Sequence, residues 1–156
     1  MKIIKNIGVL TSGGDCGGLN AAIRAIYFRA KKKYNMNVYG IKNGTLGLIK
    51  RPVEVEKLSY KTFKDFLIKQ GGTFLGTNSK GNPFKFKING KYENASKRIA
   101  SAYKSLKLDG LIVIGGDGSM NILKKIADSE RLNIVGIPKT IDNDVGSTEY
   151  SIGFHT

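Results

Sequence analysis

Two short apolar stretches constrain the fold of this chain more than any other feature of its sequence. Leu111–Ile114 and Ile134–Ile137 are apolar without alternation. Strands of a parallel sheet that is covered on both faces have this pattern, whereas a strand with one wet face alternates. Between the two stretches, Met120, Leu123 and Ile126 recur at helical spacing. Since parallel strands need a crossover connection, this arrangement predicts an α/β fold in which both strands are buried.

The other apolar segments extend the same pattern. A first strand is expected from Ile3 to Leu10, interrupted by polar residues, and a second over Val38–Ile41, with a helix between them. The predicted architecture is a doubly wound, mostly parallel sheet with helices on both faces, a Rossmann-like three-layer arrangement in which residues 1–156 form a single domain. Further expected elements are a short helix carrying Phe63, Phe66 and Leu67, a hairpin over Phe84–Tyr92, and a helix over Ile99–Leu106.

The net charge of the chain favours some classes of binding partner over others. The chain has 26 Lys and Arg residues against 12 Asp and Glu residues, a formal net charge of +14. Such an excess attracts polyanions. The sequence has no zinc-ligand spacing and no aromatic RNA-binding signature, so anionic small molecules are favoured over nucleic acid. No stretch reaches the length of a bilayer span, and the single cysteine, Cys16, cannot form an internal disulfide. We therefore expect a cytoplasmic protein that does not bind membranes.

Two glycine-rich loops each follow an expected strand and open an expected helix. They are Thr11–Gly18 and Gly115–Ser119. Glycines allow backbone N–H groups to approach an anion closely, and a helix N-terminus adds a favourable field. Neither loop ends in the Gly-Lys-Ser/Thr of a P-loop or has the spacing of a dinucleotide fingerprint. The pair predicts a phosphate site of another type, although glycines can also serve only the geometry of a tight turn.

Three aspartates are candidates for the groups that phosphoryl transfer requires. This reaction needs charge neutralisation, usually by Mg²⁺, and a carboxylate that accepts a proton from the acceptor hydroxyl. Asp117, at an expected helix start, is placed to organise Mg²⁺, while Asp142 and Asp144 could divide the roles of general base and of metal or structural ligand. The alternative is that Thr140, Asp142, Asn143 and Asp144 only build turns with the local backbone.

Five motifs together resemble the phosphofructokinase family in order and spacing. Gly-Gly-Asp-Gly alone also occurs in NAD kinases and diacylglycerol kinases, but Thr-Ile-Asp-Asn-Asp combined with Thr-Ser-Gly-Gly-Asp is specific. The matching segments are Thr11–Asp15, Gly18–Arg24, Gly72–Thr77, Gly115–Ser119 and Pro138–Asp144.

The resemblance implies an activity and a role for each matching residue. The implied activity is the glycolytic, Mg²⁺-dependent transfer of a phosphoryl group to the 1-hydroxyl of fructose 6-phosphate. Asp142 matches the catalytic base, with Lys139 and Gly118 at the same centre, and Asp117 matches the carboxylate that organises Mg²⁺. Thr140, Ile141 and Asp142 match the sugar-phosphate site. The donor-phosphate site matches Gly13, Gly14, Gly116, Asp117, Gly118 and Ser119, and Lys80 stands where the family usually has a bridging arginine.

The resemblance gives mixed signals about the phosphate donor. Glycine at position 118 leaves room for ATP, whereas Lys139 is typical of members that use pyrophosphate. A carboxylate at position 118 would crowd and repel the α-phosphate of ATP, while a lysine at 139 only adds positive charge, so ATP is favoured. Thr45 and Ile122 stand where many ATP-using members have an aromatic residue and a glycine beside adenine.

The family match ends at about half the length of a family subunit. We therefore expect this chain alone to be inactive, and the full-length form to be a homo-oligomer. Two alternatives of another class stay open at this point: a non-catalytic anion-binding module with the same fold, and a basic nucleic-acid binder.

Overall fold

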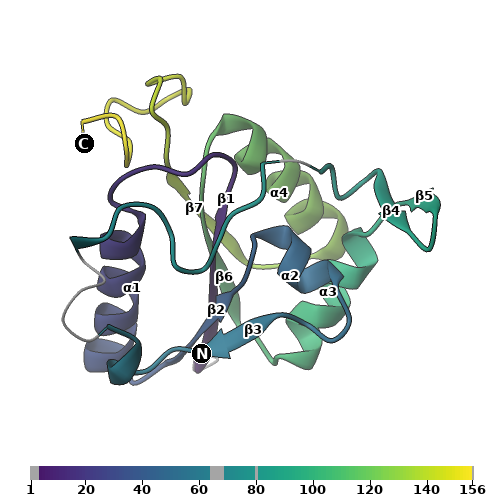
Figure 1. Cartoon of the computed structure of the whole chain (residues 1–156). Helices are drawn as coiled ribbons and strands as arrows, with labels where there is room; N and C mark the ends of the chain where they lie inside the picture. The colour runs from purple at the N-terminus through teal and green to yellow at the C-terminus, as the bar shows by residue number, and fades with distance from the viewer. Residues whose placement is uncertain (1–3, 64–68, 80, 156) are drawn as a thin grey trace.

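The computed structural model describes residues 4–63, 69–79 and 81–155 (Figure 1). The elements in chain order are β1 (Asn6–Ser12), α1 (Leu19–Tyr34), β2 (Asn37–Ile41), α2 (Thr45–Ile49), β3 (Val55–Lys57), the 3-10 helix η1 (Tyr60–Phe63), β4 (Phe86–Ile88), β5 (Lys91–Glu93), α3 (Ser96–Ser105), β6 (Gly110–Gly115), α4 (Asp117–Glu130) and β7 (Ile134–Pro138).

Five strands form one sheet in the order β3-β2-β1-β6-β7. Strands β2, β1, β6 and β7 are parallel, and β3 adds an antiparallel edge. The chain moves outward from β1 to β3 and then continues on the other side of β1 with β6 and β7. The strand order therefore reverses between β1 and β6, and in open α/β sheets ligands bind beyond the carboxyl ends of the strands at such a reversal.

Helices cover both faces of this sheet, which confirms the predicted α/β fold (Figure 1). On one face, Leu19, Ile23 and Tyr27 of α1 are buried in an apolar cluster. On the other face, α2, α3 and α4 contribute a second cluster that includes Ile99 and Leu123. Within the described residues, no helix combines the length and the apolar character needed to cross a membrane.

Strand β7 departs from the expectation of burial on both faces. Its Val135 is 62% exposed, although β6 beside it is largely buried. The prediction was wrong for this strand because a continuous apolar run does not reveal the position of a strand in the sheet. β7 lies at the edge, where it pairs with β6 through residues 134–138.

Of the other elements predicted from the sequence, the hairpin is confirmed, the first strand begins later than expected, and one helix falls mostly outside the described residues. The hairpin is confirmed as β4 and β5, joined by Asn89 (φ 48°) and Gly90 (φ 84°), which have the positive φ values of a type I′ turn. β1 begins at Asn6, so Ile4 lies outside the strand. Phe63 lies in η1, whereas the rest of the helix expected there, with Phe66 and Leu67, lies outside the described residues.

Candidate functional site

A cleft of about 470 Å³ lies at the carboxyl ends of β1, β6 and β7. Its volume is within the range of small-molecule sites. Three of its walls are the loops that follow these strands: Gly13–Asp15 after β1, Gly116–Ser119 after β6, and Lys139–Asp142 with Asp144 after β7. The cleft thus brings together every predicted site residue except Lys80, which lies outside the described residues.

The loop after β1 depends on glycine and is held from two sides. Gly13 has φ +87°, a conformation that side chains disfavour. The Thr77 hydroxyl donates a hydrogen bond of 2.6 Å to the Gly13 carbonyl, and the Gly13 N–H donates one of 3.3 Å to the Asn78 carbonyl. Lys139 Nζ donates to the Gly14 carbonyl. The loop is therefore fastened both to the segment before β4 and to the loop after β7.

Lys139 places a positive charge inside the cleft. Its side chain is only 6% exposed, and Nζ lies 3.5 Å from where a Cβ on Gly13 would stand. Within the described ranges, no carboxylate forms an ion pair with this ammonium. A buried charge that lacks a counter-ion is costly, so an anion bound in the cleft would be stabilised by Lys139.

The loop after β6 leads directly into α4. Gly116 is the N-cap and Asp117 is the first helical residue, where a carboxylate suits the helix dipole. Asp117 Oδ2 accepts a hydrogen bond of 2.9 Å from Asn121 Nδ2, one turn further along the helix. A Cβ on Gly118 would meet no heavy atom within 4 Å, so the protein leaves open space at this position.

The cleft fits a magnesium ion that arrives with a phosphorylated ligand. Among the described residues, no group of three or more His, Cys, Asp or Glu side chains converges as a metal cage. Mg²⁺ is usually bound through one or two carboxylates together with substrate phosphates and water rather than by an all-protein cage. Asp117, an exposed carboxylate on the cleft wall, could act as such a ligand.

The loop after β7 gives its two aspartates different surroundings. The buried Thr140 hydroxyl donates a hydrogen bond of 2.5 Å to Asp144 Oδ1 and accepts one of 3.0 Å from the Asp142 N–H. The Asp144 carboxylate therefore accepts a hydrogen bond from Thr140, and for these two residues the turn-building role considered above holds. The exposed Asp142 carboxylate also lines the cleft, and within the described residues it accepts no hydrogen bond from a side chain. Of the two, Asp142 is the better placed to accept a proton from a ligand.

Comparisons with known proteins show the family to which the chain belongs. The family model described as phosphofructokinase matches residues 6–156. The chain belongs to the phosphofructokinase family. It is 52% identical to the ATP-dependent 6-phosphofructokinase 1 of Synechocystis sp., covering 100% of this chain and 43% of the relative. It is 44% identical to the pyrophosphate–fructose 6-phosphate 1-phosphotransferase of Dictyoglomus thermophilum, covering 96% of this chain and 40% of the relative.

A solved structure of the family has the same fold. Phosphofructokinase from Pichia pastoris in the T-state superposes with a TM-score of 0.80 at 29% sequence identity, covering 99% of this chain and 17% of the yeast chain. The chain spans less than half the length of the two curated relatives named above. The resemblance inferred from the motifs is thereby confirmed at the level of the family.

Cys16 lies beside the cleft without the features of a nucleophile. Burial raises the pKa of its thiol, an effect opposed by the nearby Lys139 ammonium and reinforced by Asp15. A Cβ on Gly153 would stand 2.6 Å from Cys16 Sγ, so the thiol fills a tightly packed space. A protonated, enclosed thiol is unreactive, which is in accord with the space-filling role expected from the sequence.

Sequence reasoning assigned no role to three further residues of the cleft. Asp15, Asn78 and Ser79 also line it. Asp15 Oδ1 accepts a hydrogen bond of 3.0 Å from the Cys16 N–H, which helps to shape the glycine loop. Asp15 belongs to the Thr11–Asp15 motif, although no role was assigned to it. For Asn78 and Ser79 the only signal in the sequence was the small, polar character of residues 77–79, which is common to most loops. Ile122 of α4 lines the cleft as an apolar wall.

Proposed function

We propose that this chain forms the donor-binding part of an ATP-dependent 6-phosphofructokinase. The reaction is the Mg²⁺-dependent transfer of a phosphoryl group from ATP to the 1-hydroxyl of fructose 6-phosphate, a step of cytoplasmic glycolysis. The observation that carries the proposal is the convergence of Asp117, Lys139 and Asp142 on one cleft from the ends of two neighbouring strands.

Each of these groups has a place in phosphoryl transfer. The backbone of the loop after β1 and the Lys139 ammonium bind donor phosphate oxygens. Asp117 holds Mg²⁺, which neutralises charge on those phosphates. Asp142 accepts the proton of the acceptor hydroxyl, a role worth about 10²–10⁴ in rate. Thr140 and Ile141, on the same loop, contact the sugar phosphate.

ATP is the proposed donor, and pyrophosphate is the second candidate. ATP is supported by the open space at Gly118 and by the names of the relatives that are 52% identical. Pyrophosphate is favoured by one observation, the buried Lys139 ammonium at the Gly14 carbonyl, which adds positive charge where donor phosphates would lie.

Isothermal titration of the purified chain with ATP·Mg and, separately, with pyrophosphate·Mg tests the donor. We expect ATP·Mg to bind and Asp117→Asn to weaken it. Binding of pyrophosphate alone would reverse the choice of donor, and binding of neither would refute the donor site in this chain.

The proposed base is tested by Asp142→Asn in a preparation that phosphorylates fructose 6-phosphate. Because the carboxylate acts on the acceptor and not on the donor, the formation of fructose 1,6-bisphosphate should fall by about 10²–10⁴ while ATP·Mg affinity is unchanged. Turnover at the wild-type rate would exclude Asp142 as the base.

A further inference from the structure

The hydroxyl of Thr77 contacts the glycine-rich loop after β1 at Gly13. Thr77 Oγ1 donates to the Gly13 carbonyl at 2.6 Å, and the Gly13 N–H donates to the Asn78 carbonyl at 3.3 Å. The N–H and the C=O of one residue belong to successive peptide units. The two hydrogen bonds therefore fix the peptide units on both sides of Gly13.

A third contact fixes the next peptide unit, because Lys139 Nζ donates to the Gly14 carbonyl. In a planar trans peptide, the C=O and the following N–H point in opposite directions. Holding the carbonyls of Gly13 and Gly14 therefore also sets the directions of the N–H groups of Gly14 and Asp15. All three residues line the cleft.

The orientation of these peptide units matters because a phosphate accepts hydrogen bonds from N–H groups and is repelled by carbonyl oxygens. Glycine is the residue at which a peptide unit turns over most easily, since it has no Cβ. In a loop with two adjacent glycines, an unrestrained carbonyl could turn toward the anion. An external hydrogen bond to each carbonyl prevents this change.

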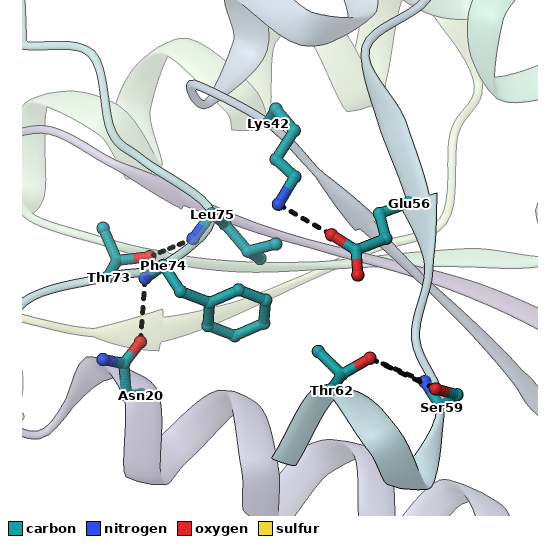
Figure 2. Close-up of polar contacts among 8 residues, drawn as sticks. All are labelled: Asn20, Lys42, Glu56, Ser59, Thr62, Thr73, Phe74 and Leu75. Carbon is teal, nitrogen blue, oxygen red and sulfur yellow. Dashed lines mark hydrogen bonds and ion pairs between the residues drawn. The ribbon is translucent and has the colours of Figure 1, made fainter. Parts of the chain in front are cut away.

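Thr77 can act as such a restraint because its own segment is anchored. Asn20 of α1 is buried, and both ends of its amide are used: Oδ1 accepts from the Phe74 N–H at 2.8 Å and Nδ2 donates to the Gln70 carbonyl at 3.1 Å. Figure 2 shows the bond from Asn20 to Phe74. The Thr11 hydroxyl of β1 also donates to the Gly76 carbonyl at 2.9 Å. The segment before Thr77 is thus tied to both α1 and β1.

We propose that Thr77 is a positioning residue for donor binding: its hydroxyl holds the Gly13–Gly14 peptide unit in the orientation that presents N–H groups to a phosphate. The ligand class rests on the proposed function, since the bound group is the phosphate of ATP or pyrophosphate. Thr77 acts through the loop and need not touch the ligand.

Thr77→Val tests the proposal, because valine keeps the shape of threonine and removes the donor. Isothermal titration should show about fivefold weaker binding of both ATP·Mg and pyrophosphate·Mg, the effect of one hydrogen bond of typical strength. Thr77→Ser retains the hydroxyl and should restore the affinity to within about twofold of wild type. Thr77→Ala provides a second variant without the hydroxyl should valine impair folding.

Thr62→Val is the matched control. The Thr62 hydroxyl accepts a hydrogen bond of 3.1 Å from the Ser59 N–H at η1, as Figure 2 shows. Neither residue lines the cleft. The same chemical change there should leave donor affinity unaltered. Wild-type affinity in both Thr77→Val and Thr77→Ala, or an equal loss in Thr62→Val, would overturn the proposal.

Amide hydrogen exchange measured by NMR tests the proposal without a ligand. In Thr77→Val, the Gly13 N–H should exchange about fivefold faster, because its partner segment has lost the companion hydrogen bond. An unchanged rate would overturn the positioning role even if no donor binds. If the wild-type chain binds neither donor, the proposed function fails, and the exchange rates still decide whether Thr77 holds the loop.

Discussion

Replacing Gly118 by aspartate should weaken ATP binding without weakening the fold. Gly118 is the second residue of α4, and a Cβ there would meet no heavy atom within 4 Å. Any residue other than glycine or proline favours a helix more than glycine does, and an acidic residue in the first turn interacts well with the helix N-terminus. Together these effects should raise the free energy of unfolding by about 0.5–1 kcal/mol.

The new carboxylate would project into open space on the wall of the donor cleft. Two like unit charges about 4 Å apart repel by about 1 kcal/mol in water and about 4 kcal/mol at the effective dielectric constant near a protein surface. A position exposed on a cleft wall lies between these limits. Affinity for ATP·Mg should therefore fall between about fivefold and about a thousandfold.

The assay is isothermal titration of wild type, Gly118→Asp and Gly118→Asn at one Mg²⁺ concentration, together with urea unfolding of each. Asparagine has nearly the same volume without the charge, so Gly118→Asn should lose much less affinity. Pyrophosphate·Mg should be less affected than ATP·Mg, since pyrophosphate has no α-phosphate. Equal losses in the Asp and Asn variants, or unchanged ATP binding in Gly118→Asp, would refute the electrostatic reasoning.

Two further expectations concern packing and the thiol. Gly47→Ala should lower the free energy of unfolding by about 1–3 kcal/mol in urea, because the added methyl would overlap the backbone oxygen of Lys42. Gly71→Ala is the control: its methyl would meet no heavy atom within 4 Å, so the free energy of unfolding should be nearly unchanged. Burial raises the pKa of the Cys16 thiol, so this thiol keeps its proton to higher pH in the folded chain than in the unfolded chain. Iodoacetamide reacts with the thiolate, and at pH 8 it should therefore modify the native protein more slowly than the protein in urea. Equal rates in the two states would contradict this assignment.

The sequence predicted the parts of the fold that local patterns determine. β6 and the helix α4 that follows were recognisable from a buried apolar run and from the spacing of Leu123 and Ile126. The antiparallel strand β3 was not, because Val55-Glu56-Lys57 is short and mostly charged. Helix α2 was also missed, since five residues with Gly47 in the middle give no helical periodicity.

In the candidate site, too, the sequence predicted what local patterns determine and missed contacts between distant residues. Its three glycine- and aspartate-containing loops were found because each directly follows an expected strand, and parallel strands place their carboxyl ends at one edge. The bond from Lys139 to Gly14 joins residues 125 positions apart, and the bond from Thr77 to Gly13 joins residues 64 apart. No local pattern encodes such contacts, since they depend on the final packing of the loops.

The pairing of β1 with β6 has a consequence for how the chain folds. These strands are adjacent in the sheet, yet β2, β3 and the β4–β5 hairpin lie between them in sequence. Contacts between such distant segments form against a large loop-closure entropy, which slows folding. The loops after β1 and β6 become neighbours only when Gly8 has aligned with Leu111. The ability to bind a phosphorylated ligand should therefore appear late in refolding, after most of the helical circular dichroism has returned. Ligand binding would thus report the correct register of β1 and β6 more directly than circular dichroism does.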